Sequence, residues 1–375
     1  MDALMLPLNW QRVKLGDIGK PCMCKRVMKH QTTRYGEIPF YKIGTFGNTA
    51  DAFISKKLFL EYKTKYSFPK KGDILISASG TIGRAVIYDG KPAYFQDSNI
   101  VWIDNDETLV KNDFLFYAYS NVKWNTEHTT ILRLYNDNFR NTLIPLPPLN
   151  EQSAIANILS DLDRYLYALD ALILKKESVK KALSFELLSQ RKRLKGFNQA
   201  WQRVRLGDIC EITTGSLDAN EMVHYGKYRF YTCAKEYYFI DKYAFDTEAI
   251  LISGNGAYVG YVHYYKGKFN AYQRTYVLDN FSEHIIFVKY FLTMFLQSHI
   301  QTNRNEGNTP YIVMATLKDF EILLPPLNEQ SAIANILSAL DNEIISLKNK
   351  KRQFENIKKA LNHDLMSAKI RVLEK

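Results

Sequence analysis

One fifteen-residue segment occurs twice in the chain. LPPLNEQSAIANILS stands at 146–160 and again, letter for letter, at 324–338, which is 178 positions later. A second repeated motif begins each half, because WQRVKLGDI at Trp10 and WQRVRLGDI at Trp201 differ at a single position. The motifs follow in the same order in both halves, and the distance between them is 13 residues shorter in the second copy. The chain is therefore a tandem duplication, and we expect it to fold as two similar units.

The identity of the repeated segment exceeds what burial alone requires, because protein cores tolerate volume-conserving substitutions at modest cost. A recent duplication or recombination is one explanation. The functional explanation is that both copies present the same surface to a partner. The first polar residues of the repeat are the candidates for that contact: Asn150, Glu151, Gln152, Asn328, Glu329 and Gln330.

The region between the two motifs predicts a mixed α/β domain in each copy. Short β-branched and aromatic runs bounded by Gly, Pro, Asn and Asp are typical of strands. In the first copy these runs cover 38–43, 74–77, 84–88 and 98–103, and a helix is expected in each copy, at 112–122 and 283–299. GDILISASGTIGRAVIYDGKPAYF in the first copy resembles EAILISGNGAYVGYVHYYKGKFNAY in the second, so we expect one framework with different loops.

After each Pro-Pro pair the sequence changes to a long helical pattern. Asn150 and Asn328 are good N-cap residues, and no Pro or Gly follows in the first copy until about residue 195. Such a helix would be about 70 Å long. Apolar residues recur at alternate spacings of four and three, which is a heptad pattern: Ile155, Leu159, Leu162, Leu166, Leu169 and Ile173, then Ile333, Leu337, Leu340, Ile344 and Leu347.

The fold class predicted from these patterns is α/β (α+β) with an internal pseudo-two-fold repeat. It has four segments: a globular domain at 1–148, a helix at 149–195, a second globular domain at 196–326 and a second helix at 327–375. Because neither helix can bury its apolar stripe alone, we expect the two to pack on each other. An antiparallel pair would place two similar heads at the ends of a rigid coiled-coil spacer.

The charge of the chain favours an anionic partner. The formal net charge is +11 and the pI is about 9.2, which is common in proteins that bind nucleic acid, an anionic membrane surface or an acidic protein. We find no signal peptide and no run of 18 apolar residues. The four cysteines, Cys22, Cys24, Cys210 and Cys233, do not resemble a disulfide framework, so we expect a cytoplasmic protein without a membrane.

The sequence contains no recognisable motif of catalysis or cofactor binding. GTIG at 80–83 and SGNGAYVG at 253–260 lack both the dinucleotide-binding spacing and a Walker lysine, so turns between strands are expected. Cys22 and Cys24 have no second Cys or His pair nearby, and the histidines are scattered. We therefore predict no catalytic residue, no metal site and no cofactor in this chain.

Polar loops of the two variable regions are the candidate DNA-binding sites. They interleave cations and amides, which contact phosphates and base edges, with tyrosines, which pack on sugars or bases. The residues selected in the first copy are Arg34, Tyr35, Lys42, Thr45, Asn48, Ser79, Thr81, Arg84 and Arg133. Those in the second copy are Lys227, Arg229, Lys235, Asn255, Tyr258, Arg274, Arg304 and Asn308.

The order of these motifs resembles that of a known family. A Trp-x-x-Val-x-Leu-Gly-Asp-Ile motif, a variable region, then LPPLNEQ and a long helix, all repeated once, is similar to the specificity subunit of type I restriction-modification systems, over essentially the whole chain. The resemblance implies two target recognition domains that each read one half of a bipartite, asymmetric site in double-stranded DNA. It also implies conserved spacer helices that set the separation of the half-sites and bind two methyltransferase subunits.

The same resemblance implies that catalysis resides in partner subunits. These would carry AdoMet and adenine methylation, and restriction subunits would add cleavage that depends on ATP and Mg. Three alternatives remain from the residues themselves: the recognition chain of a type IIB-like or fused system, a complete methyltransferase or nuclease, and a coiled-coil scaffold that binds only proteins. The missing catalytic motifs disfavour the second, and the third leaves the variable regions unexplained.

Overall fold

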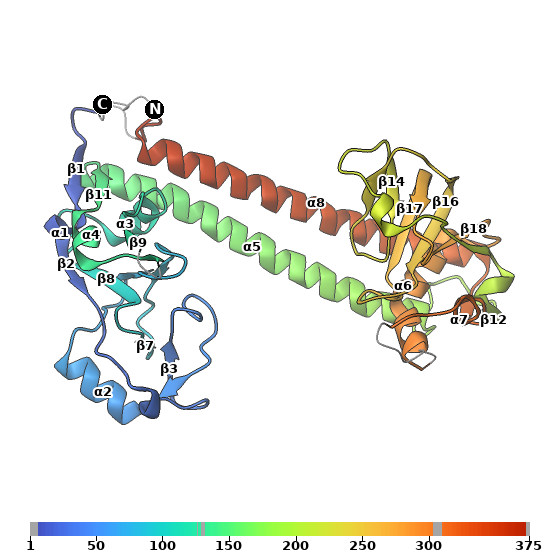
Figure 1. Cartoon of the computed structure of the whole chain (residues 1–375), viewed down its shortest axis with the longest axis horizontal. Helices are drawn as coiled ribbons and strands as arrows, with labels where there is room; N and C mark the ends of the chain where they lie inside the picture. The colour runs from blue at the N-terminus through green and yellow to red at the C-terminus, as the bar shows by residue number, and fades with distance from the viewer. Residues whose placement is uncertain (1–6, 126, 129–131, 303–309, 373–375) are drawn as a thin grey trace. The chain divides into compact units, whose positions relative to one another are not determined.

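The computed structural model of the chain describes residues 7–125, 127–128, 132–302 and 310–372 (Figure 1). The chain divides into two compact units, the first formed by Met1–Asp170 with Lys350–Lys375 and the second by Ala171–Asn349. We call the part of the first unit that precedes helix α5 the first head. The part of the second unit that lies between helices α5 and α8 in sequence is the second head.

The two repeated motifs pair with each other in each head. Strand β1 (Gln11–Lys14) is antiparallel to β11 (Leu143–Leu146), and β12 (Gln202–Arg205) is antiparallel to β19 (Glu321–Leu324). A short helical turn follows the first strand of each pair, α1 (Leu15–Ile18) or η2 (Leu206–Asp208). The WQRV strand therefore lies directly beside the strand that leads into LPPLNEQ, which explains why both motifs are retained together.

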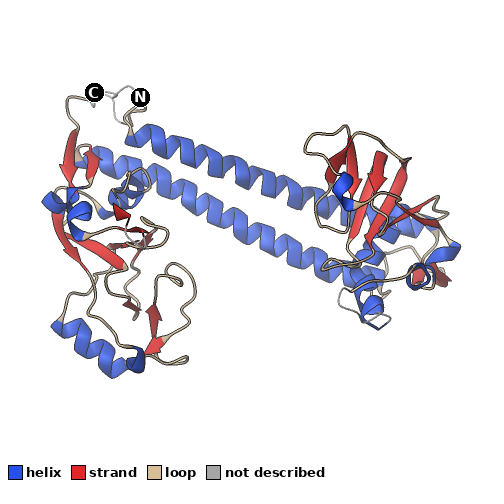
Figure 2. Cartoon of the chain, in the orientation of Figure 1, coloured by secondary structure: helices blue, strands red, loops and turns tan. Residues whose placement is uncertain are grey.

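The sheets of the two heads have the same strand order. The first head has the sheets β2-β8-β5-β6 and β4-β3-β7, and the second has the single sheet β13-β18-β16-β17-β14-β15 (Figure 2). The strands of the first head are β2 (Gly19–Cys22), β3 (Ile38–Tyr41), β4 (Phe53–Ile54), β5 (Ile74–Ser77), β6 (Ala85–Ile87), β7 (Tyr94–Phe95) and β8 (Ile100–Asn105). Those of the second are β13 (Glu211–Thr214), β14 (Tyr228–Tyr231), β15 (Tyr238–Ile240), β16 (Phe245–Ser253), β17 (Val262–Ala271) and β18 (Thr275–Asp279).

Strand β17 of the second head corresponds to two strands of the first head, β6 and β7. β17 pairs with β16 through its first part and with β14 through its last three residues, whereas β6 pairs with β5 and β7 pairs with β3. The prediction of one fold in both copies is confirmed by this equivalence. The predicted strands at 38–43, 74–77, 84–88 and 98–103 are also confirmed, with small shifts at their ends.

Helix α2 (Lys56–Lys65) accounts for the difference in length between the copies. The offset between equivalent residues is 190 at Ile38 and Tyr228 but 176 at Ile74 and Ile250. The missing residues of the second copy therefore lie between β15 and β16, where the first head has α2. Ser55 caps this helix, because its side chain accepts a hydrogen bond from the Leu58 N–H.

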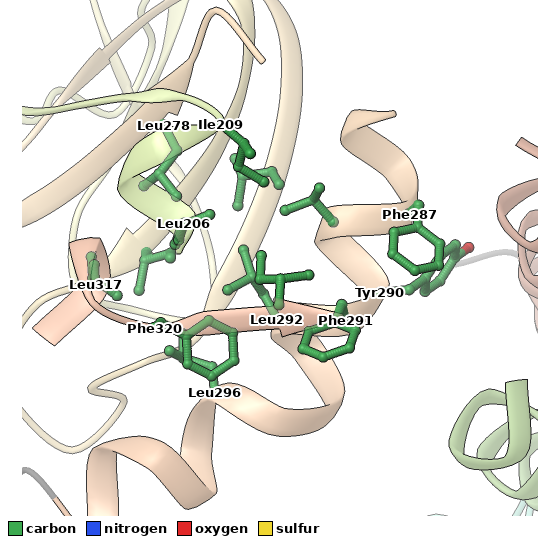
Figure 3. Close-up of a cluster of buried hydrophobic side chains, with 14 of the residues drawn as sticks. Leu206, Ile209, Leu278, Phe287, Tyr290, Phe291, Leu292, Leu296, Leu317 and Phe320 are labelled. Carbon is green, nitrogen blue, oxygen red and sulfur yellow. The ribbon is translucent and has the colours of Figure 1, made fainter. Parts of the chain in front are cut away.

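A helix packs on one face of each sheet. In the second head α6 (Ile285–Thr302) covers β16 and β17, and its apolar side chains join those of η2, β18 and α7 (Met314–Lys318) in one buried cluster (Figure 3). The equivalents in the first head are α3 (Asn112–Tyr119) and α4 (Asn136–Asn141). The remaining elements are η1 (Lys29–Gln31), η3 (Ala219–Glu221), β9 (Glu127–His128) and β10 (Leu132–Arg133). The predicted helices at 112–122 and 283–299 are thus confirmed, although α3 ends three residues earlier.

The two long helices are α5 (Leu149–Leu188) and α8 (Leu327–Met366), of 40 residues each. In the first unit Lys358 bonds to Asp163 and Lys351 lies 2.7 Å from Asp170. Residue numbers therefore rise along one helix as they fall along the other, which confirms the antiparallel pairing within this unit. The described helices contain no 18-residue stretch apolar enough to cross a bilayer.

The second unit shows the same antiparallel arrangement. Lys176 lies 2.8 Å from Glu343, and Lys180 bonds to Asp341. These ion pairs flank the apolar seam, as charged residues do beside the seam of a coiled coil.

Both helices are shorter than the heptad pattern predicts. α5 ends at Leu188 instead of near residue 195, because Gln190 takes a positive φ of 61°, and Ala368, two residues past α8, has a φ of 56°. At each end the chain turns back, with the Lys192 N–H donating to the Glu186 carbonyl at 3.1 Å. Neither residue is the glycine that commonly ends a helix, so the sequence carried no stop signal at this point.

A buried glutamate joins three segments in each unit. Glu151 is 2% exposed and accepts hydrogen bonds from Trp10 Nε1 at 3.1 Å and from Arg371 Nε and Nη2 at 2.7 and 2.9 Å. Trp10 lies in the first repeated motif, and Arg371 lies beyond the end of α8. The glutamate at the start of the first copy's helix is therefore paired with an arginine that follows the helix of the second copy.

The second unit repeats this arrangement, with its Glu and Arg 178 positions and its Trp 191 positions from those of the first unit. Glu329 is fully buried and accepts from Trp201 Nε1 at 3.2 Å and from Arg193 Nε and Nη2 at 3.2 and 2.6 Å. Arg193 follows α5, which is the helix of the first copy. We call each group of Glu, Trp and Arg a carboxylate node.

The glutamines after these glutamates also have partners inside their heads. Gln152 Oε1 accepts from the Lys111 N–H at 2.8 Å, and Gln152 Nε2 donates to the carbonyl of Pro147 at 2.8 Å. Gln330 makes the equivalent bonds with the His284 N–H at 3.0 Å and the Pro325 carbonyl at 2.8 Å. Both glutamines are nearly inaccessible to solvent.

These contacts narrow the predicted partner surface of the repeated segment. Of the six residues selected, Glu151, Gln152, Glu329 and Gln330 are buried and bonded within their own units. A structural requirement accounts for their identity in both copies. Contact with a partner stays a prediction for the two exposed members, Asn150 and Asn328.

We expect the carboxylate node to contribute strongly to the stability of its unit. Replacing Glu329 by alanine leaves the Arg193 guanidinium, whose side chain is 24% exposed, without its counter-ion. Breaking a buried ion pair costs roughly 3 to 5 kcal/mol, and the partial exposure places our expectation near the lower value, about 3 kcal/mol. Urea unfolding of the full chain, followed by tryptophan fluorescence, measures the change in the free energy of unfolding.

The matched control is Glu321→Ala. Glu321 pairs with Arg203 at 2.7 Å, but more than half of each side chain is exposed, so this change should cost no more than about 1 kcal/mol. Equal losses in the two variants would contradict a special role for the buried node.

Candidate nucleic-acid interface

Three segments meet at the end of the central strands in each head. The turn between β5 and β6 forms a β-bridge with the end of β10, which precedes α4 in sequence (Ser79 to Arg133). The turn between β16 and β17 forms the equivalent bridge with the chain before α7 (Asn255 to Tyr311). The third segment is the chain that enters β8 or β18. Its backbone joins the turn, because the Ala78 N–H donates to the Asn99 carbonyl at 2.7 Å and the Gly254 N–H to the Arg274 carbonyl at 2.8 Å.

Asn99 organises this junction in the first head. Its Oδ1 accepts from Ser79 Oγ at 2.8 Å and from Arg133 Nη2 at 2.9 Å. Ser79 is buried, so its hydroxyl serves this network, while Arg133 is half-buried. The structure thus brings together two predicted site residues, and it adds Asn99, which sequence reasoning missed because a lone Asn before a strand also suits an ordinary turn.

The other candidates of the first head divide by what their side chains contact. Arg84 Nη1 donates to the Phe46 carbonyl at 3.0 Å, Lys42 Nζ lies 2.8 Å from Asp51, and the Thr45 hydroxyl accepts from the Lys42 N–H at 3.1 Å. These three help to hold the loop after β3. The remaining candidates have exposed side chains: Arg34, Tyr35, Asn48 and Thr81.

In the second head the candidate cations lie beside tyrosine rings. Arg229 Cζ is 4.2 Å from the ring centre of Tyr237, and Lys235 Nζ is 5.1 Å from that of Tyr258. Attraction to the π face orients a cation without neutralising it. Arg274 and Lys227 are exposed and Asn255 is half-buried. Arg304 and Asn308 lie outside the described residues.

Sequence reasoning selected only one of the tyrosines that gather on this face. Tyr231 and Tyr265 lie in strands, where tyrosines are equally typical of a core, and Tyr231 is indeed buried. Tyr237 and Tyr261 lie in the adjoining loops, and none of the four was selected. A histidine joins them, since the His263 ring lies 4.7 Å from that of Tyr261. Burial lowers the pKa of His263 below its ordinary value, against the bond of its ring to the Ala234 carbonyl and the charge of Glu236.

Glycines allow the turn of each head to approach a neighbouring segment closely, the chain after α3 in the first head and α6 in the second. Gly83 and Gly260 occupy equivalent places and have positive φ values of 83° and 80°. A Cβ on Gly83 would lie 2.1 Å from Trp124 Nε1, and one on Gly260 would lie 2.4 Å from Ile300 Cδ1. The glycine-rich motifs thus serve as strand-to-strand turns, as predicted, and no phosphate loop is needed to explain them.

No metal site is evident in the part of the chain that the structure describes, since no three His, Cys, Asp or Glu side chains come together there. The four cysteines are free thiols. Burial raises the pKa of Cys24 and of Cys210 to about 12, so neither forms the thiolate that a nucleophile or metal ligand requires at neutral pH.

The glycine turn gives a test of how the interface is supported. Gly256 and Gly260 lie in the same turn with φ values of 81° and 80°, but an added Cβ meets nothing within 4 Å at Gly256. We expect Gly256→Ala to cost about 1 to 2 kcal/mol from the backbone conformation alone. Gly260→Ala should cost at least about 1 kcal/mol more, because Ile300 and Gln297 have to move.

Urea unfolding of the two variants measures this difference. Similar losses in both would show that the turn is not held against α6, and would remove the close approach from the description of the interface.

The family model of the type I restriction modification DNA specificity domain matches twice, at residues 7–177 and 198–356. These two matches coincide with the two copies of the repeat and together cover most of the chain.

Individual relatives carry the same description. A putative type I restriction enzyme specificity subunit of Haemophilus influenzae is 64% identical over 148 residues, which are 39% of this chain and 38% of the relative. The specificity subunit of the Escherichia coli type I restriction enzyme EcoDI is 38% identical over 170 residues, 44% of this chain and 37% of the relative. The alignments thus span less than half of these two proteins. The type I restriction enzyme MjaVIII specificity subunit of Methanocaldococcus jannaschii is 26% identical over 99% of this chain and 95% of its own.

A solved structure shares the fold. The S subunit of a type I restriction-modification system from M. genitalium superimposes with a TM-score of 0.66 at 18% identity, covering 97% of this chain and 98% of that one. At this level of identity the likeness concerns the fold alone. It agrees with two α/β heads and two long helices in one chain.

Proposed function

Because the chain belongs to the family of type I restriction modification DNA specificity domains, we propose that it is the DNA-recognition subunit of a type I restriction-modification complex. In this proposal each head is a target recognition domain for one half of a bipartite, asymmetric site in double-stranded DNA. The chain supplies recognition and carries no catalytic residue of its own. This reading also implies a cytoplasmic protein.

The observation that carries the proposal is the contrast between the constant and variable parts of the two heads. The strand order and the carboxylate nodes are the same in both. The side chains at the junction differ, with Ser79 and Arg133 in one head and Asn255 and Tyr311 at the equivalent bridge in the other. Two heads with one framework and different polar side chains are suited to two different half-sites, and the charge of +11 suits the DNA backbone.

We further propose that the partners are two methyltransferase subunits, bound through equivalent surfaces of the two copies. An internal two-fold repeat supports this stoichiometry, because equivalent surfaces offer equivalent binding sites to identical subunits. AdoMet and adenine methylation, and ATP- and Mg-dependent cleavage by restriction subunits, would belong to these partners. The recognition chain of a type IIB-like or fused system would share the first head and second head but not these separate partners.

The proposal is tested by expressing the full chain with a methyltransferase subunit of the same kind of system and mapping modified adenines by long-read sequencing. We expect one asymmetric motif with two parts and a fixed gap. Methylation by this chain alone, or methylation without sequence preference beside an active partner, would overturn the proposal.

The length of the helices gives a prediction about the gap. Removing one heptad from each helix, at 167–173 in α5 and 345–351 in α8, removes both members of the Asp170–Lys351 ion pair and retains the carboxylate nodes. Seven residues of helix correspond to about 10 Å, or roughly three base pairs of DNA. We expect the gap in the methylated motif to change by about that amount, or methylation to be lost because the heads also rotate.

The control keeps the length and changes exposed positions of the same heptads, for instance Tyr167→Ala with Ile345→Ala. Both side chains are more than half exposed, so the gap should not change. An unchanged gap in the shortened chain would refute the role of the helices as spacers.

A further inference from the structure

The two heads differ in a charged side chain at one place on their shared framework. Arg229 is the second residue of β14, and the second residue of the equivalent strand β3 is Pro39. The residues two positions later, Tyr231 and Tyr41, are the same in both heads. A long cation therefore replaces a small apolar residue at one point of an otherwise similar strand.

In the second head the Arg229 guanidinium is held between aromatic rings. Its Cζ lies 4.2 Å from the ring centre of Tyr237 and 4.5 Å from that of Tyr265, and Nη1 donates to the Tyr231 hydroxyl at 3.3 Å. The two rings and this hydrogen bond restrict the guanidinium before any ligand binds. A ligand then meets a preorganised fork of donors, and less side-chain entropy is lost per hydrogen bond formed.

This arginine has no counter-ion among the described residues, although acidic side chains pair with many other cations of the chain. Arg229 is half-buried, and the contact with Tyr231 uses one of its five N–H donors. A fixed, half-buried guanidinium without a carboxylate partner retains donors for an external acceptor.

The equivalent place in the first head is a hollow. A pocket of about 420 Å³ is lined there by Pro39 and Tyr41 of β3 with the rings of Phe46, Tyr88 and Phe95. Its lining contains no arginine. The charged residues of its lining are Lys91 and Asp89, which pair with each other at 3.2 Å. The first head thus has a recess with aromatic walls and a paired lysine where the second head has an arginine without a carboxylate partner.

Both places adjoin the candidate interface. The pocket of the first head is also lined by Gly47 and Asn48, from the loop that Arg84 holds. In the second head Tyr261 of the turn lies 4.7 Å from the His263 ring, and Tyr265, two positions further along β17, lies 4.5 Å from the Arg229 guanidinium. The arginine therefore continues the same surface.

We propose that Arg229 reads a guanine in the half-site of the second head, by donating to O6 and N7 in the major groove, and that the first head has no counterpart of this contact. The inference rests on the proposed function, because it assumes that the second head binds DNA. Two parallel donors in a fixed plane match the two acceptors of guanine and of no other base. A phosphate contact is the alternative, and it would carry no base preference.

The test begins with the motif mapped for the unchanged chain in complex with its methyltransferase subunits. Arg229→Gln keeps a planar side chain and loses the fork, and Arg203→Gln, at an exposed surface pair, is the matched control. We expect Arg229→Gln to weaken binding of the cognate duplex roughly 5- to 150-fold, as the loss of one bidentate contact implies. We also expect it to remove the preference for guanine at one position of one half-site only.

A change in the DNA gives an independent readout that needs no variant. Replacing each guanine of the site in turn by 7-deazaguanine removes N7, and one position should weaken binding by the unchanged protein about fivefold or more. The same replacement should have no further effect in Arg229→Gln. If Arg229→Gln does not fold, Tyr237→Leu removes one wall of the stack and should reduce the sensitivity at that same guanine.

The outcomes separate this inference from the proposed function. Absence of any bipartite motif for the unchanged complex would remove the proposed function itself. A normal motif whose half-site for the second head contains no guanine on either strand, equal weakening of all duplexes by Arg229→Gln, or insensitivity of every guanine to 7-deaza substitution would overturn only the role of Arg229.

Discussion

The buried carboxylate at the start of each long helix is the interaction on which the rest of the structure depends. Glu151 and Glu329 are removed from water almost completely, which costs several kcal/mol unless a charged partner and hydrogen bonds offset the loss. The partners are a tryptophan that immediately precedes the first strand of the same copy and an arginine that follows the helix of the other copy. Neither head is therefore complete with residues of one copy alone.

A second contact between the two copies lies further along each long helix, at Asp163 and Asp341. Asp163 accepts from Tyr117 of α3 at 2.8 Å and bonds to Lys358 of α8, and Asp341 accepts from Tyr290 of α6 at 2.6 Å and bonds to Lys180 of α5. Burial alone would raise the pKa of Asp341, but the hydrogen bonds from Lys180 and Tyr290 hold it below its ordinary value. Each head is thus attached to both helices of its unit through two charged contacts.

These constraints explain part of the repeated segment and leave part of it unexplained. Glu151, Gln152, Ile155 and Leu159 are buried in the node or the core, so a change in one copy would require a compensating change in its partners. Asn157 and its counterpart Asn335 are exposed but also identical. Burial does not account for their identity. It is explained either by a recent duplication or by a surface that both copies present to a partner.

The sequence predicted the architecture well because the relevant signals are local or repeated. The duplication, the strand runs and the heptads each follow from a pattern within one segment, and the antiparallel pairing within each unit follows from the need to bury two apolar stripes. The end of α5 was predicted wrongly, because a non-glycine residue, Gln190, takes a positive φ there. Contacts such as Glu151 with Arg371 join residues 220 positions apart, and no local pattern could pair them.

The candidate site was less predictable for the same physical reason. Several polar residues selected from composition, such as Ser79 and Thr45, turned out to support loops, while Asn99 and the tyrosines around Arg229 were missed. An arginine or tyrosine in a strand has the same sequence signature whether it stacks within the fold or faces a ligand. Only the spatial neighbours distinguish these cases.

The side chains on the two faces of each sheet are therefore constrained to different degrees. One face packs on α3 or α6 and, through these helices, on the charged contacts with α5 and α8. On the other face Leu75 and Trp102 lie in a cluster with Phe59 of α2, whereas their equivalents Leu251 and Val277 pack with Tyr231 and Phe269 in a head that lacks α2. A helix has been gained or lost on this face without altering the strand order. Side chains on that face can consequently change what a head binds while the attachment of the head to the helices stays the same.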